Sequence, residues 1–199
     1  MQKYEIKGHK VLYDDELHLY FVDGAKCLSV TQFLKTVFPD KYSGVSEEVL
    51  EKAAKKGTNV HNAIELYEDV GFESPLIKEF RNYKFLKEYY HFEVIDFEKP
   101  VLIPYNDTFI CGRFDLLVKE GDSLGIADIK CTSTLDKEWL TLQTNLYKLG
   151  YEYSYDTKID LLRGLHLKND TRKYVEIKVI DNLFDKIEKI KKGAYIIWM

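Results

Sequence analysis

Two apolar runs near the middle of the chain, residues 108–118 and 124–130, constrain the fold because each carries an acid among hydrophobic side chains. The first run contains Asp115, and the second ends in Asp128-Ile129-Lys130. A glycine-containing turn separates the runs, which predicts that they pair as adjacent strands and bring the two acids close together. Buried carboxylates repel each other and lose hydration, so they need a cation or an ionic partner. The two acids therefore indicate either a metal site or a structural ion pair.

The patterns around these runs alternate between helical and extended periods, and they predict a mixed α/β fold. Extended segments are expected within residues 1–30, which contain an Asp23-Gly24 hairpin turn, and at 93–104, 108–118, 124–130, 158–168 and 173–180. Helices are expected at 31–38, from Ser46, whose side chain can cap the helix, to about Tyr67, and at about 75–90, 133–150 and 182–192. From residue 75 onward the order is helix, three strands, helix, strand.

The helix that follows Ser46 is expected to be irregular. Its apolar stripe consists of Val49, Ala53, Val60, Ile64 and Tyr67. Gly57 interrupts this stripe, and a glycine inside a helix costs about 1 kcal/mol relative to alanine. Its presence indicates a break in the helix or the close approach of another backbone. Ser133 and Asp136 predict a capping box at the start of the later helix expected at 133–150.

The length of 199 residues predicts one domain over residues 1–199, with residues 1–45 as an N-terminal lead-in of strands and a short helix. The formal net charge of −4 argues against a wholly basic nucleic-acid coat protein. Local basic stripes are nevertheless enough for contact with DNA. Two stripes are present, and either can also be an ordinary solvated helix face: Lys52, Lys55 and Lys56, and Lys186, Lys189, Lys191 and Lys192.

The three cysteines, Cys27, Cys111 and Cys131, include no C-x-x-C pair. This spacing does not support a zinc ribbon or a four-cysteine iron–sulfur cluster, and sparse cysteines fit a reducing cytoplasm. The first residues, MQKYEIKGHK, contain no apolar leader, and no run approaches membrane-spanning length. We therefore expect a cytoplasmic protein with no membrane partner.

Asp128 and Lys130 lie two residues apart, so in a strand their side chains share one face while Ile129 points to the other. The Ile129 carbonyl then lies between them. Carboxylate and carbonyl oxygens suit Mg²⁺ or Mn²⁺, and a lysine can orient or deprotonate an attacking water or balance phosphate charge. The alternatives are a surface ion pair between Asp128 and Lys130, and an ion pair of Asp115 with Arg113 or Lys130.

Two further pairs of polar residues lie four positions apart beside the apolar stripes of predicted helices. His61 and Glu65 share one helix face, and Gln143 and Tyr147 share another. A neutral His61 imidazole can complete a metal site with the two acids. Gln143 and Tyr147 can form hydrogen bonds to a phosphate or to the lysine. The alternative for each pair is an ordinary amphipathic helix edge.

Taken in chain order, these residues resemble the motif series of the RecB-like branch of the PD-(D/E)XK nucleases. That branch includes the RecB nuclease domain and the mitochondrial genome maintenance exonuclease. The matching residues, within 57–147, are Gly57, His61 and Glu65, then Gly112 and Asp115, then Asp128 and Lys130, and finally Gln143 and Tyr147. The lead-in segment DGAKCLSVTQFL also resembles small phage and prophage members of this branch.

The resemblance implies a restriction-endonuclease-like αβββαβ core, with a central mixed sheet flanked by helices. It implies that one or two Mg²⁺ or Mn²⁺ ions are bound by His61, Asp115, Asp128 and the Ile129 carbonyl. It also implies that Lys130 is the catalytic lysine and that Gln143 and Tyr147 support the substrate or the lysine. Glu65 matches the pattern without a defined role. The chain lacks the iron–sulfur cysteines of some relatives and a helicase segment, so unwinding would need a partner.

The activity implied is that of a metal-dependent deoxyribonuclease, with an exonuclease favoured, in phage or prophage recombination, replication or repair. Its cellular setting would be the cytoplasm of a bacterium or a phage-infected host cell. DNA contacts would be made mainly to the backbone, with little sequence specificity. A recombination or helicase partner and an oligomer are compatible with the sequence. Three alternatives stay open: an endonuclease of the same fold, a DNA- or partner-binding protein without cleavage, and an α/β scaffold in which the motif order is coincidental.

Overall fold

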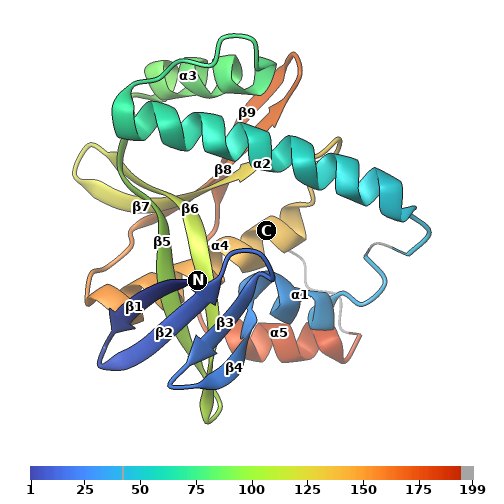
Figure 1. The fold of residues 1–199 in the computed structure, drawn as a ribbon, viewed down its shortest axis with the longest axis vertical. Coiled ribbons are helices and arrows are strands. Elements are labelled where there is room, and N and C mark those ends of the chain that lie inside the picture. The colour runs from blue at the N-terminus through green and yellow to red at the C-terminus, as the bar shows by residue number, and fades with distance from the viewer. Residues whose placement is uncertain (42, 194–199) are drawn as a thin grey trace.

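The structure is a computed structural model that describes residues 1–41 and 43–193. Its elements, in chain order, are β1 (Gln2–Ile6), β2 (His9–Asp14), β3 (Leu19–Val22), β4 (Ala25–Ser29), α1 (Val30–Val37), α2 (Glu47–Val70), α3 (Lys78–Tyr90), β5 (Glu93–Tyr105), β6 (Thr108–Glu120), β7 (Ser123–Lys130), α4 (Lys137–Tyr155), β8 (Leu161–Lys168), β9 (Thr171–Ile177) and α5 (Leu183–Lys191) (Figure 1). The order from α3 to β8 confirms the expected mixed α/β class with an αβββαβ core.

The strands form a mixed sheet in the order β1-β2-β3-β4-β6-β7-β8-β9, and β5 pairs with β6 outside this path. Neighbouring strands are antiparallel except for β4 with β6 and β7 with β8, which are parallel. The predicted Asp23-Gly24 turn joins β3 to β4, and both residues have the positive φ angles, 51° and 86°, that suit such a turn. The lead-in strands are thus continuous with the strands that carry the two acids.

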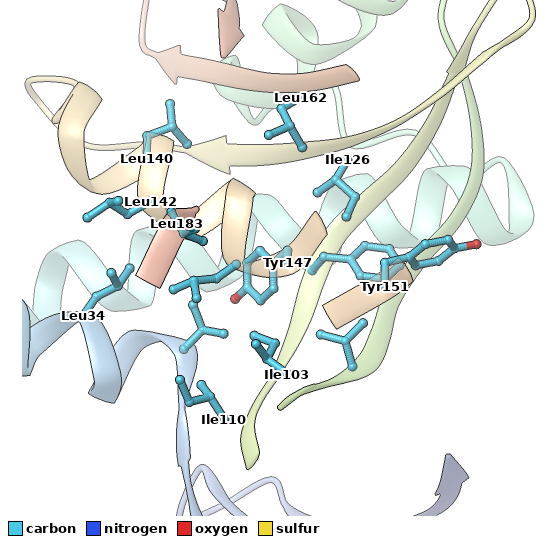
Figure 2. Packing of buried hydrophobic residues seen from close by; sticks show 14 of the residues in the cluster. Leu34, Ile103, Ile110, Ile126, Leu140, Leu142, Tyr147, Tyr151, Leu162 and Leu183 are labelled. Carbon is cyan, nitrogen blue, oxygen red and sulfur yellow. The ribbon is translucent and has the colours of Figure 1, made fainter. Parts of the chain in front are cut away.

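Helices cover both faces of the central strands. On one face, α1, α4 and α5 pack against the sheet through a cluster that includes Leu34, Leu146 and Ile187. Figure 2 shows this cluster, with Tyr147 of α4 among the aliphatic side chains. On the other face, α2 and α3 pack through a cluster that includes Ile64 and Tyr83. Two buried layers of this kind hold the central strands between them.

The structure corrects the prediction for the helix after Ser46. α2 runs without a break from Glu47 to Val70, and a Cβ added at Gly57 would have no atom within 4 Å. Gly57 therefore marks neither a helix break nor a close backbone approach. Val49 is 56% exposed and Ala53 is exposed too, so only the second half of the predicted stripe reaches the core. The first half of α2 extends beyond the sheet (Figure 1).

The helix caps also differ from the predicted ones. The Ser46 side chain makes no capping hydrogen bond to α2. At α4 the cap is Asp136 instead of Ser133, and its carboxylate accepts a hydrogen bond of 2.9 Å from the Trp139 amide. A capping box of the expected type is present at α1 instead, between Ser29 and Gln32. This capping box fixes the start of α1 directly after β4.

Candidate metal centre

The backbone pairing between β6 and β7 ends just before Asp115 and Asp128. The last paired residues are Leu116 with Ala127, so Asp115 and Asp128 are the first residues beyond the ladder. On the same edge of β6, β4 pairs only with Ile110 and Cys111. Residues 112–115 therefore have no strand neighbour on this edge among the described residues. The predicted pairing of the two runs is present, but it ends just before the two acids.

A side chain takes over the role of the missing ladder bond. The amide of Ile129 donates a hydrogen bond of 2.6 Å to Oδ2 of Asp115. A buried amide that leaves a ladder needs such an acceptor. The bond ties β7 to β6 just past the point where they separate, and it fixes one Asp115 oxygen while the other stays available. Neither Arg113 nor Lys130 forms the ion pair with Asp115 that was the alternative from sequence.

Asp128 and Lys130 share a face of β7, as expected, and form an ion pair. This is not a surface pair, because Asp128 is fully buried and the Lys130 side chain is 21% exposed. Oδ1 of Asp128 has no hydrogen-bond partner among the described residues. Burial raises the pKa of Asp128 to about 6, against the opposing attraction of Lys130 and with a further contribution from Asp115. A buried oxygen without a partner indicates a group that is incomplete without a ligand.

The third acid of the site is Glu98 of β5, which sequence reasoning missed. Phe97 pairs with Leu116 and Lys99 with Phe114, so the register places Glu98 opposite Asp115. Residues opposite one another in an antiparallel pair have neighbouring side chains. Glu98 has a φ of 47°, in the left-handed region that non-glycine residues rarely adopt. The register could have been predicted by counting back from the Asn106-Asp107 turn, but the left-handed backbone could not.

His61, Glu98 and Asp115 form a potential metal-binding cluster, with one ligand atom of each within 4.8 Å of the others. His61 lies on α2, and its Nδ1 is 3.7 Å from Oδ1 of Asp115. All three side chains are partly buried. The structure therefore joins two of the predicted ligands, His61 and Asp115, to an unpredicted one. Asp128 lies outside this cluster, and a role for the Ile129 carbonyl stays a prediction.

The electrostatics of the cluster favour a cation. Burial raises the pKa of Glu98 to about 8, with a further contribution from the negative charge of Asp115, against the attraction of Arg113. Burial also raises the pKa of Glu65, which lies one helical turn after His61, against the attraction of His61 and Arg113. Two facing carboxylates and an imidazole are a nitrogen and oxygen donor set that suits Mg²⁺ or Mn²⁺. The residues present fit such an ion.

Gln143 and Tyr147 lie on α4, but both are buried instead of lying at the helix edge. Nε1 of Trp139 donates a hydrogen bond of 3.0 Å to Gln143, whose Nε2 lies 3.4 Å from the Tyr147 hydroxyl. Burial and the nearby charge of Asp115 raise the pKa of Tyr147 well above its ordinary value. Tyr147 thus borders the site as a neutral phenol. Among the described residues, neither Gln143 nor Tyr147 forms a hydrogen bond with Lys130.

Gly112 has a structural reason to be a glycine. A Cβ at this position would lie 2.8 Å from Cε1 of Tyr147 and 3.0 Å from Cγ2 of Val30. Such distances are shorter than side-chain contacts allow. The absence of a side chain lets Tyr147 approach β6 at the unpaired edge. The glycine of the predicted motif Gly112-x-x-Asp115 therefore has a packing role.

The two predicted basic stripes make contacts away from this cluster. Lys56 of α2 forms an ion pair of 2.7 Å with the buried Glu79. Lys191 of α5 pairs with Glu188 at 3.1 Å. Neither ion pair by itself identifies a binding site, and the exposed pair of Lys191 with Glu188 contributes little stability. A role of either stripe in DNA binding stays a prediction.

No family model matches the sequence, and no curated protein sequence matches it. Among solved structures, the crystal structure of SSO0001 is similar, with 17% sequence identity and a TM-score of 0.49. The similarity covers 84% of this chain and 73% of that one. Within the described part of the chain, no helix has the length and apolar character needed to cross a membrane.

Proposed function

We propose that this protein is a metal-dependent deoxyribonuclease that hydrolyses phosphodiester bonds, acting as an exonuclease in phage or prophage recombination, replication or repair. One observation carries the proposal. At the unpaired edge of β6, two predicted ligands and a third acid come within metal-binding distance, directly beside a buried Asp–Lys pair. Metal ligands next to a lysine provide what phosphodiester hydrolysis requires: activation of water and compensation of phosphate charge.

Within this proposal, His61, Glu98 and Asp115 hold the ion, with Asp128 and the Ile129 carbonyl on the adjoining strand end. A divalent ion at this place would polarise the scissile phosphate and lower the pKa of the attacking water. Asp115 has a second task, because its other oxygen accepts the Ile129 amide. The same carboxylate thus binds the ion and holds β7 in position, which couples the metal geometry to the end of the strand.

Lys130 acts through its positive charge. Burial by itself lowers the pKa of Lys130, but the attraction of Asp128 and Asp115 is larger, and the pKa is raised above its ordinary value. A positively charged lysine can donate hydrogen bonds to water and to phosphate oxygens. We therefore assign it to orienting the attacking water and balancing the charge that develops on the phosphate oxygens. Gln143 and Tyr147 act as positioning residues, through the packing of Tyr147 against Gly112.

The test is a nuclease assay with Mg²⁺ or Mn²⁺ on end-labelled linear DNA and on covalently closed circular DNA. We expect degradation of the linear DNA only, with loss of activity in Asp128→Ala and after chelation of the metal. The exposed Asp122→Ala, in the turn after β6, is the matched control and should behave as wild type. Cutting of both substrates would make the protein an endonuclease with the same site. No metal-dependent cutting of either would contradict the proposal and favour a DNA- or partner-binding protein.

A further inference from the structure

A cavity of about 580 Å³ adjoins the metal cluster and is not used by the proposed chemistry. It lies between the β2–β3 hairpin, the start of α1 and the first half of α2. Glu98, Arg113 and Tyr147 line its inner end, so the cavity and the metal cluster share a wall. We propose that this cavity binds one unpaired nucleotide of the strand being cut, next to the scissile phosphate. This inference rests on the proposed function and names the substrate of the same site.

The inner end of the cavity presents a guanidinium group to a phosphate. Arg113 is 23% exposed, and its Nε lies 3.2 Å from Glu98. Its guanidinium carbon lies 4.4 Å from the centre of the Tyr13 ring. The acid and the ring hold the planar group in place, and a fixed guanidinium is well suited to binding phosphate oxygens. Arg113 is two residues from Asp115 on the same strand, so a phosphate held here lies beside the metal cluster.

A second cation lies at the outer wall. Lys35 and Thr31 are one helical turn apart on α1, both are exposed, and both line the cavity. The capping box of Ser29 and Gln32 fixes the N-terminal end of α1, where the helix dipole is positive and Thr31 lies, whereas Lys35 belongs to the last turn. A nucleotide between Arg113 and Lys35 would therefore have positive charge on two sides. The overall charge of −4 makes this local arrangement informative, because it is not a consequence of a basic protein.

The hairpin supplies a ring for the base. His18 is exposed and lines the cavity, and its Nδ1 lies 2.9 Å from the Tyr13 hydroxyl. Tyr13 is itself buried and packs against Tyr20 with a ring distance of 4.6 Å. The hydrogen bond to a buried tyrosine restrains the imidazole, which leaves its face available to stack on a base. Stacking of bases on aromatic side chains is tolerant of sequence and requires an unpaired base.

The walls restrict the substrate to a single strand. A volume of about 580 Å³ is that of a small-molecule pocket, which accepts a nucleotide but not a base pair with its neighbours. Ala54 in the exposed first half of α2 closes the side opposite the hairpin. That half of α2 extends beyond the sheet and is mostly exposed (Figure 1). A strand reaching the metal cluster through the cavity must therefore be unpaired at the cut.

The experiment compares two substrates that both require the metal cluster. Bis(4-nitrophenyl) phosphate needs only the cluster, whereas a labelled oligothymidylate also occupies the cavity. For Lys35→Ala and His18→Ala we expect the ratio of kcat/KM on the oligonucleotide to that on the ester to fall about tenfold. Lys26→Ala, exposed on β4 outside the cavity, is the matched control and should keep the wild-type ratio. Lys35→Ala should also reduce the salt dependence of oligonucleotide binding by about 0.7 in logarithmic slope.

Two results would overturn the inference while leaving the proposed function intact. One is an unchanged ratio in both cavity variants; the other is equal affinity for a blunt duplex and for the single strand. If the wild type hydrolyses neither substrate with Mn²⁺, the proposed function fails by itself. The cavity is then still tested by fluorescence anisotropy of the labelled oligothymidylate, where equal affinity of wild type and both variants would contradict the inference.

Discussion

The two edges of β6 are built differently. Along one edge, β5 pairs with β6 from Thr108 to Lys119. Along the other, β4 pairs only at Ile110 and Cys111, and β7 only from Leu116 to Glu120. At the continuous edge the backbone makes most of its own hydrogen bonds, apart from a register shift between Val94 and Asp96 and a missing pair at Glu98. At the interrupted edge a side chain must do so, and the space released by the missing strand is occupied by Asp115, Asp128 and their neighbours.

The comparison teaches that the candidate site lies where β6 loses its neighbour on one edge, beside Glu98 of β5 on the other. The continuous edge contributes backbone pairing and buried apolar side chains such as Val118, which need no ligand. Where the other edge is interrupted, the fold holds Asp115 and Asp128 close to Glu98 of β5; the pKa values of Glu98 and Asp128 are raised, and a buried Asp128 oxygen lacks a partner among the described residues. Perturbed carboxylates of this kind are typical of functional sites. Substitutions at the two edges should therefore have separable effects.

The largest expected effect is on catalysis. Lys130→Ala, at the interrupted edge, should reduce DNA cleavage by a factor of about 10² to 10⁴, the range typical of a positioned catalytic group. Metal binding should persist, because the lysine is not a ligand. The matched change at the continuous edge is Lys119→Ala, an exposed lysine opposite Glu93, which should cleave like wild type. Measured turnover of Lys130→Ala equal to wild type would remove the lysine from the mechanism.

The next effect is on stability. Gly112→Ala places a Cβ against Tyr147 and Val30, and overpacking of this kind costs about 1–3 kcal/mol. The free energy of unfolding from urea titration should fall by that amount, and cleavage should fall as well because Tyr147 is displaced. A Gly112→Ala variant with wild-type stability and activity would show that the close approach of Tyr147 to β6 is not required.

Glu98 and Asp128 should give the metal-free protein an unusual pH dependence. Glu98 has a folded-state pKa of about 8 against an ordinary value of 4.5, so the folded protein binds a proton that the unfolded chain has lost between these values. Stability should therefore fall as pH rises through this window. Asp128 acts in the same direction between 3.8 and about 6. Since a metal ligand must be deprotonated, affinity for Mn²⁺ should rise over the same range.

Glu98→Gln isolates this contribution. The unfolding free energy of the metal-free variant should decline less with pH than that of wild type, and its Mn²⁺ affinity should be at least about tenfold weaker, a loss of about 1.4 kcal/mol. Chemical denaturation across the window, with and without Mn²⁺, measures both. Parallel stability curves for the variant and wild type would show that Glu98 does not retain its proton in the folded state.

The smallest effect concerns the glycine of the helical motif. Gly57→Ala meets open space on a continuous helix, so it should raise stability by up to about 1 kcal/mol. Cleavage should be unchanged, because Gly57 has no contact that an added methyl group would disturb. Thermal unfolding and the nuclease assay check both parts. A stable but inactive Gly57→Ala would mean that DNA passes along this turn of α2.

Much of the site could be predicted because local periodicity determines it. The alternation of β7 placed Asp128 and Lys130 on one face, and the hairpin turn brought Asp115 close to both. Glu98 was missed because its register opposite Asp115, which follows from the Asn106-Asp107 turn, was not counted out, and its left-handed backbone has no local sequence signal. The fold class was recoverable from the order of helical and extended periods.

Errors arose where periodicity was taken to indicate burial. The apolar spacing of α2 correctly predicted a helix, yet Val49 is exposed, since no element of the described part of the chain buries it. Conversely, Gln143 and Tyr147 were expected at a helix edge but are buried, because Gly112 leaves room for the phenol ring. In both cases the burial of the side chain depends on what packs against the helix, and the sequence of the helix alone does not contain this information.

The central claim is that the interrupted edge of β6 is a divalent metal site. Calorimetric titration of Mn²⁺ into the wild type, Asp115→Asn and the continuous-edge control Asp96→Asn tests it most directly. We predict saturable binding of one or two ions to the wild type and to Asp96→Asn, and its loss in Asp115→Asn while circular dichroism shows a retained fold. Indistinguishable isotherms for wild type and Asp115→Asn, or no binding to the wild type, would contradict the account.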